Sequence, residues 1–261
     1  MGTSCSVFAA GLPALELLKA EFWVRTVAAR LTRFERGSEL SRLNAAAGRW
    51  TAISPELEAV LRASMRAYEL SGGLVNVAVL PSLLAAGYTR PLAEGATPAA
   101  LDGVHSAPVV PDVLEIAPGK ARLAPNAGID LGGIAKGWMA DRLCERIGSN
   151  AVVNLGGDLR ARGDGPEGAG WPIGLAGTTV MLRDHGAATS SVLRRRWGDG
   201  LHHLIDPRTG RPAASGLVEV SVVAATALDA EIVAKTALIA GPEIAPAFCA
   251  ANADAWWLLP E

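Results

Sequence analysis

The sequence predicts an α+β fold with mixed, mainly antiparallel sheets and packed helices. Apolar residues recur at helical spacing in some stretches and alternate with small or polar residues in other, shorter stretches. These two patterns follow one another without the regular strand–helix–strand repeat of a parallel sheet. The 29 glycines and 16 prolines indicate frequent turns, and no linker is long enough to divide the chain. A single domain covering residues 1–261 is therefore expected.

Helices are predicted where apolar side chains recur every three or four residues. The first two predicted helices cover 13–37 and the residues from Ser54 to Gly72-Gly73. The third follows Gly132-Gly133 and includes 139–147, and the fourth covers 230–241. Ser54 is a typical N-cap and Pro55 suits the first helical position. The second helix is therefore expected to begin at Pro55.

Strands are predicted where short apolar stretches are bounded by turn residues. They cover 74–80, 129–131, 151–155, 171–175, 187–190, 201–205, 218–224 and 256–259. The last of these is expected to be a buried strand. Residues 87–119 are rich in proline, alanine and glycine, so they are expected to be connecting structure with short elements.

Composition and charge exclude several classes of protein. Half of the residues are apolar, 19% are charged and the net charge is −2, which excludes a disordered chain and argues against a nucleic-acid surface. Cys5, Cys144 and Cys249 form no CxxC pair, so neither a disulfide framework nor a zinc site is expected. The first ten residues show neither a basic region nor the leader of a lipidated cysteine, and no apolar run reaches membrane-spanning length. A cytoplasmic location is expected.

The segment from Asp130 to Asp141 places two glycines between a predicted strand and a predicted helix. Glycine N–H groups and a helix N-terminus suit a phosphate, and Lys136 adds positive charge in the first helical turn. The spacing is neither a Walker A loop nor a GxGxxG fingerprint. A tight strand-to-helix turn explains the glycines equally well, but Lys136 with Asp130 and Asp141 favours a binding site.

Three other segments carry polar residues. His202-His203 precede the turn Asp206-Pro207-Arg208-Thr209-Gly210, and this cluster favours a functional role over a purely structural turn. Glu231 and Lys235 lie four residues apart in a predicted helix, which by itself indicates a surface ion pair. The segment 38–44 is explained as a polar turn that opens with a capping serine.

Taken together and in this order, eight segments resemble the FAD:protein FMN transferase family, formerly described as thiamine-biosynthesis lipoproteins. They are 1–3, 38–44, 71–73, 130–141, 154–158, 188–190, 203–210 and the helix at Ala230-Glu231. The resemblance implies that FMN is moved from FAD to a threonine hydroxyl of a target flavoprotein, that AMP is released, and that magnesium takes part. It also implies an FAD cleft between two lobes.

The resemblance also implies roles for individual residues. His203 would accept the threonine proton, with Asp206 as the second catalytic residue, since a histidine is near neutral at pH 7 by its reference pKa. The residues placed around FAD are Met1, Asn44, Leu74, Val75, Asn76, Asp130, Gly132, Lys136 and Ile205. The metal site comprises Gly133, Glu231 and Lys235, with Lys235 as a substitute cation rather than a ligand.

The chain departs from the family pattern at several positions. Val75-Asn76 replaces a typical Phe-Asp, and Ser191 replaces a typical Gly. Glu231 replaces the metal-binding Asp, and Lys235 replaces a Thr four residues later. A protonated lysine has no lone pair for a metal, so weaker dependence on magnesium is expected.

Two other functions stay open from the sequence. One is an FAD pyrophosphatase that gives FMN and AMP, and the other is a non-catalytic flavin-binding protein. The presence of His203 and Asp206 favours chemistry over binding alone. A flavoprotein acceptor is the expected partner, and no nucleic acid or transmembrane segment is expected, although many members of the family are exported.

Overall fold

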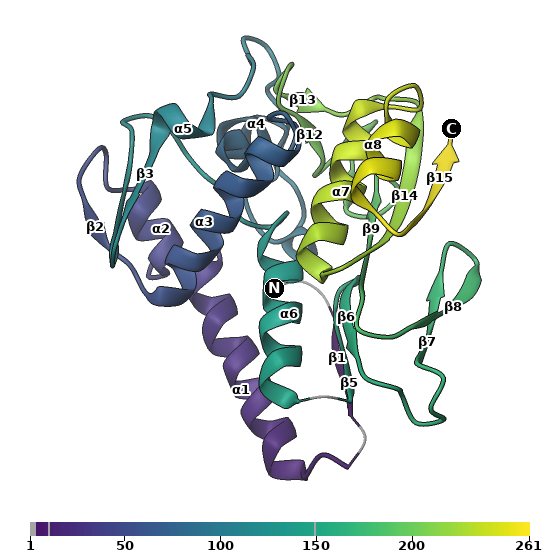
Figure 1. Cartoon of the computed structure of the whole chain (residues 1–261). Helices are drawn as coiled ribbons and strands as arrows, with labels where there is room; N and C mark the ends of the chain where they lie inside the picture. Colours follow the sequence, from purple (N-terminus) through teal and green to yellow (C-terminus); the bar gives the residue numbers. More distant parts are fainter. Residues whose placement is uncertain (1–3, 10, 149) are drawn as a thin grey trace. The chain divides into compact units, whose positions relative to one another are not determined.

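The structure is a computed structural model that describes residues 4–9, 11–148 and 150–261. The described chain divides into two compact units. The first contains 27–133 and 192–215, and the second contains the described residues of 4–26, 134–191 and 216–261. Figure 1 labels many of the elements of both units.

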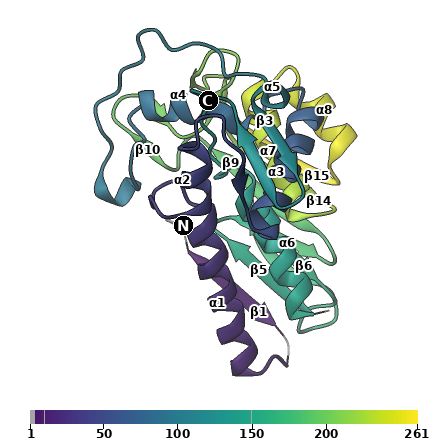
Figure 2. The same ribbon diagram turned by 90° about the vertical axis from the view of Figure 1, so that its left-hand side faces the viewer.

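The second unit is built on an antiparallel sheet of six strands in the order β1-β5-β6-β9-β14-β15. The strands are β1 (Cys5–Ala9), β5 (Ala151–Leu155), β6 (Asp158–Arg162), β9 (Gly186–Ser191), β14 (Leu217–Ala224) and β15 (Ala255–Pro260). The N-terminal strand β1 lies beside β5 in both views of the chain (Figures 1 and 2). Its register places Val7 opposite Val153. The predicted antiparallel arrangement is confirmed here.

Two helices pack on this sheet. They are α6 (Ala135–Ile147), which contacts β5 and β6, and α7 (Ala227–Ala240), which contacts β9 and β14. They also contact each other, and α8 (Ala245–Asn252) packs on α7. The hairpin of β7 (Trp171–Leu175) and β8 (Thr178–Leu182) contributes Trp171 and Leu182 to a buried cluster with Val152 and Val223 of the sheet.

The first unit combines short helices with small antiparallel sheets. Its helices are α2 (Glu39–Asn44), α3 (Pro55–Leu70), α4 (Leu80–Ala85), α5 (Val110–Val113) and the 3-10 turns Val77–Val79 and Leu92–Glu94. Its sheets are β2-β4-β3 (Thr51–Ala52, Lys120–Leu123, Leu114–Ala117), β10-β11 (Arg196–Trp197, Leu201–His202) and β12-β13 (Ile205–Asp206, Arg211–Pro212). Helix α1 (Ala14–Leu31) belongs to the second unit up to Thr26 and to the first from Val27.

The predicted helix starts are confirmed where a side chain caps the helix. Ser54 accepts a hydrogen bond from the Leu57 N–H (3.3 Å), and α3 begins at Pro55 as expected. The predicted helix over 13–37 ends earlier, at Leu31, since Ser38 caps the separate short helix α2. Side-chain caps explain where α3 and α2 begin, because they satisfy backbone N–H groups that have no partner inside the helix.

Two predicted strands in the first unit are wrong. In 74–80, the Asn76 carboxamide accepts a hydrogen bond from the Ala78 N–H (2.8 Å), which starts a 3-10 turn that continues into α4. The side chain thus offers the backbone a local partner in place of a sheet ladder. Residues 129–131 are not a strand either, because the Ile129 N–H and C=O both bond to the Asn44 side chain, at 2.9 Å each.

Two further strand predictions need correction. The predicted strand 201–205 is divided between β11 and β12, which pair with different partners. The C-terminal strand β15 exists, but it lies at the edge of the sheet beside β14 and is partly exposed, with Leu259 50% exposed. Among the described residues, no helix combines the length and the apolar character needed to span a membrane.

Candidate functional site

The turn that precedes α6 is held by Asp130. Its Oδ1 accepts a hydrogen bond from the Gly132 N–H (2.8 Å), and its Oδ2 accepts one from Arg33 Nε (2.6 Å). Arg33 also donates to the Tyr88 carbonyl (2.6 Å), and its side chain is only 5% exposed. Asp130 therefore joins the glycine turn to a buried guanidinium within the first unit.

The Arg33 guanidinium lies beside two aromatic rings, and a third ring packs on one of them. Arg33 lies 4.2 Å from the ring centre of Phe34 and 4.6 Å from that of Tyr88, and Tyr88 lies 5.3 Å from Trp197. Trp197 donates its indole N–H to the Ala86 carbonyl (2.7 Å), which orients the ring. The rings are partly exposed, so they offer aromatic faces on which a planar ring system can stack.

The sequence did not indicate this aromatic cluster. Phe34 fitted the apolar pattern of the first predicted helix, and Tyr88 and Trp197 lie far from it in the chain. The end of the apolar pattern could have indicated the cluster, because Phe34 follows Arg33 there and precedes a polar turn. Ile205, expected near FAD, does lie here: it is buried with Leu83 and Ala86, and Tyr88 and Trp197 pack against them.

Of the other residues expected around FAD, Asn44 and Asn76 have structural partners in the first unit. Asn44 holds the Ile129 backbone, as described above, and Asn76 caps the turn at Ala78 and donates to the Pro108 carbonyl (2.9 Å). Val75 is buried and Leu74 is half-buried. Met1 lies outside the described residues. The assignment of these residues to FAD stays a prediction.

The second unit contains a buried cluster of four charged residues, Lys136, Asp158, Glu231 and Lys235. Glu231 Oε1 lies 2.8 Å from Lys136 Nζ and 3.7 Å from Lys235 Nζ. Lys136 Nζ also forms an ion pair with Asp158. The side chains of Asp158 and Glu231 are 4% and 3% exposed, and those of both lysines 14%. The expectation of a surface pair of Glu231 and Lys235 is therefore wrong.

The close approach of α6 and α7 explains why Glu231 is buried. A Cβ on Gly137 would lie 2.8 Å from the Ala227 carbonyl oxygen and 2.9 Å from Glu231 Oε2. With glycine at this position, the Gly137 N–H donates to Glu231 Oε2 (2.9 Å). Burial by itself raises the pKa of Glu231, but Lys136 and Lys235, with the Gly137 N–H, outweigh it and lower the pKa. Glu231 is therefore ionised at neutral pH.

Asp158 reaches this cluster through a hairpin that was not predicted from the sequence. Strands β5 and β6 are joined by Gly156-Gly157, both with positive φ (73° and 101°), and Asp158 is the first residue of β6. Asn154 accepts a hydrogen bond from the Gly157 N–H (2.9 Å). A glycine pair between an apolar stretch and a stretch of alternating polar and apolar residues is a hairpin signal, and it would have predicted β6.

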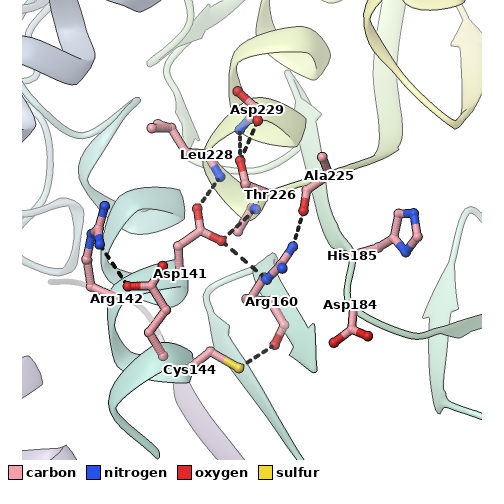
Figure 3. Close-up of polar contacts among 12 residues, drawn as sticks. Asp141, Arg142, Cys144, Arg160, Asp184, His185, Ala225, Thr226, Leu228 and Asp229 are labelled. Atoms are coloured by element: carbon pink, nitrogen blue, oxygen red, sulfur yellow. Dashed lines mark hydrogen bonds and ion pairs between the residues drawn. The ribbon is translucent and has the colours of Figure 1, made fainter. Parts of the chain in front are cut away.

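Asp141 anchors the start of α7 (Figure 3). Its Oδ1 and Oδ2 accept hydrogen bonds from the N–H groups of Ala227 (2.9 Å) and Leu228 (3.0 Å), and Arg160 Nε lies 3.8 Å from Oδ1. Burial raises the pKa of Asp141 to about 6, although these hydrogen bonds and Arg160 favour the charged form. Asp141 therefore positions the helix that carries Glu231 rather than forming part of a phosphate cradle.

The turn after His203 is held by its own residues. Asp206 forms two parallel bonds with Arg208, from Nε to Oδ1 (2.9 Å) and from the terminal nitrogen to Oδ2 (2.7 Å). This contact raises the pKa of Arg208. Gly210 has a φ of 70° and donates its N–H to the Asp206 carbonyl (2.8 Å), which closes the turn. The Asp206 carboxylate is thus engaged by Arg208, and its catalytic role stays a prediction.

The two histidines differ in their surroundings. His202 is 7% exposed, its Nε2 lies 3.0 Å from the Ala213 carbonyl oxygen, and its Nδ1 accepts the Leu204 N–H (3.3 Å). Burial lowers the pKa of His202, which keeps the ring neutral. His203 is half-buried. His202 is therefore held by structural contacts, and the functional role of His203 stays a prediction.

The residues expected to bind magnesium do not fit this ion. Both oxygens of Glu231 already accept hydrogen bonds, from Lys136 and the Gly137 N–H, and Lys235 offers an ammonium without a lone pair. Among the residues that the structure describes, no group of three or more His, Cys, Asp or Glu side chains is arranged to hold a metal. Gly133 lies in the first unit and contributes no side chain.

The architecture is that of known flavin transferases. The crystal structure of the Pseudomonas stutzeri flavinyl transferase ApbE in its apo form matches with a TM-score of 0.83 at 23% identity, over 100% of this chain and 90% of that chain. The flavin transferase ApbE from Vibrio cholerae matches with a TM-score of 0.79 at 24% identity, over 99% and 94%. At these identities the likeness establishes the fold.

Sequence comparison then gives the family. Residues 1–257 match the model of the ApbE family, so the chain belongs to this family. The FAD:protein FMN transferase of Treponema pallidum is 31% identical over 242 residues, which cover 79% of this chain and 66% of that protein. That of Escherichia coli K12 is 36% identical over 135 residues, covering 46% of this chain and 38% of that protein. The aligned part is therefore well under half the length of the Escherichia coli relative.

Proposed function

We propose that this protein is an FAD:protein FMN transferase that moves FMN from FAD to a hydroxyl of an acceptor flavoprotein and releases AMP. The observation that carries the proposal is the match of residues 1–257 to the ApbE family, with relatives named for this activity. The acceptor oxygen attacks the FMN phosphorus, the bond to the AMP oxygen breaks, and the hydroxyl proton passes to a base. Threonine is the proposed acceptor residue.

Several residues of the chain suit parts of this reaction. In the first unit, the aromatic rings of Phe34, Tyr88 and Trp197 provide faces for a planar ring of FAD. The glycine turn Gly132-Gly133 is placed beside the diphosphate, and the Gly132 N–H would leave Asp130 Oδ1 to bind it. His203 is the proposed base. Because Lys136 is already paired with two carboxylates, the phosphate contacts are assigned mainly to the backbone of this glycine turn.

The direct test is incubation of the protein with FAD and a candidate acceptor, followed by in-gel flavin fluorescence of the acceptor. Covalent fluorescence with release of AMP is the expected result. Release of FMN and AMP without labelled acceptor would identify a pyrophosphatase instead. FAD binding without either product would identify a flavin-binding protein.

The role of His203 is tested separately. His203→Ala is expected to lower the transfer rate by about 10²–10⁴-fold with FAD binding largely kept, because general-base catalysis contributes about this much. His185→Ala is the matched control, because this side chain is 42% exposed and lies in the other unit. An equal loss of rate in both variants, or loss of FAD binding in His203→Ala, would contradict the assignment.

A further inference from the structure

The four-residue cluster in the second unit is balanced in charge. At neutral pH, Lys136 and Lys235 supply two positive charges, and Asp158 and Glu231 supply two negative charges. All four side chains are at least 86% buried, so solvent screens them little. A divalent cation placed here would have to displace an ammonium group or leave the cluster with excess positive charge.

Lys235 is the residue that completes this balance. It lies one helical turn after Glu231 on α7, and its ammonium approaches the same oxygen, Oε1, that Lys136 contacts. Without Lys235, Lys136 would be the remaining cation of the cluster, and the two carboxylates together with Lys136 would carry a net charge of −1. Such a site would attract a divalent cation, as carboxylate oxygens are the usual ligands of magnesium.

We propose that Lys235 is a built-in substitute for a divalent metal ion, and that the Lys136–Asp158–Glu231–Lys235 cluster is electrostatically complete without metal. The ammonium of Lys235 supplies positive charge beside Glu231 and repels a metal ion from the same position. The wild-type protein therefore binds no magnesium or manganese through Glu231. Substitution of Lys235 by a neutral residue converts the cluster into a metal site.

The experiment measures manganese binding directly by electron paramagnetic resonance. Lys235→Thr is expected to gain one saturable Mn²⁺ site at least about tenfold tighter than any binding by the wild type, because a nearby positive charge has been removed. Addition of Mg²⁺ should compete for this site and raise the thermal midpoint of the variant but not that of the wild type. Lys235→Met should also gain affinity, since the charge drives the effect.

Two controls separate this site from incidental binding. Lys19→Thr removes a lysine from the exposed pair with Glu16, where the lysine side chain is 61% exposed, and should gain no site. Adding Glu231→Gln to Lys235→Thr should abolish the gained site. Lys235→Met preserves a long side chain, so it decides the question if Lys235→Thr does not fold.

Two results would overturn the proposal. One is Mn²⁺ binding by the wild type that Glu231→Gln abolishes. The other is a folded Lys235→Thr or Lys235→Met variant that binds Mn²⁺ no better than the wild type. The link to activity rests on the proposed function: transfer by the wild type should persist in EDTA. Absence of transfer under every condition would contradict the proposed function alone, because the binding measurements do not depend on it.

Discussion

Helices α3 and α7 carry the same local pattern with opposite surroundings. Glu58 and Arg62 on α3 are four residues apart with a contact of 2.8 Å, and their side chains are 21% and 53% exposed. Glu231 and Lys235 on α7 have the same spacing, but their side chains are 3% and 14% exposed. The difference is that α6 covers Glu231 and contributes Lys136 to it. The spacing of two charged residues within one helix therefore does not predict whether their side chains are buried.

The largest expected effect is the loss of a cation from the buried cluster. Lys136→Ala leaves Asp158 and Glu231 with Lys235 alone, and removal of one partner from a buried ion pair typically costs about 3–5 kcal/mol. The free energy of unfolding, measured with urea, should fall by this amount. A loss below about 1 kcal/mol would mean that the cluster is as well solvated as the pair on α3.

The next effect concerns the start of α7. The unfolded carboxyl of Asp141 titrates near its ordinary value of about 3.9, whereas burial raises its folded pKa to about 6. The folded state therefore holds a proton that the unfolded state releases, and stability falls as the pH rises from about 4 to 6, by on the order of 3 kcal/mol.

Asp141→Asn should remove this pH dependence. The measurement is the free energy of unfolding at several pH values between 4 and 7, for the wild type and the variant. Ser54→Ala, which removes the local cap of α3, is the matched comparison: it should lower stability by about 1 kcal/mol at every pH. Identical pH profiles for the wild type and Asp141→Asn would contradict the buried position of this carboxyl.

A smaller effect is expected where α6 and α7 touch. Gly137→Ala places a methyl group 2.8 Å from the Ala227 carbonyl oxygen, and overpacking of this kind typically costs about 1–3 kcal/mol. Gly174→Ala in β7 is the control, because no atom lies within 4 Å of the added methyl group. Thermal unfolding of both variants checks the prediction, and equal midpoints would show that the helices separate without cost.

The smallest effect belongs to the exposed pair. Arg62→Ala on α3 should change the free energy of unfolding by no more than about 1 kcal/mol, because exposed ion pairs contribute little. Added salt should reduce even this difference. A loss as large as that of Lys136→Ala would remove the contrast between the two helices.

The sequence alone determined the features that depend on neighbours within a few residues. The caps at Ser38 and Ser54 and the close of the turn at Gly210 were all predicted and are present. Each follows from hydrogen bonds between groups that the chain itself holds close together. The sequence alone also showed the family resemblance, because the resemblance rests on short segments that follow one another in a given order along the chain.

Only the tertiary structure decided which polar groups meet and which are buried. Lys136 and Glu231 are 95 residues apart, and Asn44 and Ile129 are 85 apart. The Asn76 side chain bonds to the Ala78 N–H and forms a turn where a strand was predicted. The Asn44 side chain bonds to the Ile129 N–H, which a neighbouring strand would otherwise have bound. The reason is that desolvation and charge pairing depend on the three-dimensional neighbours of a residue, which neither spacing nor periodicity contains.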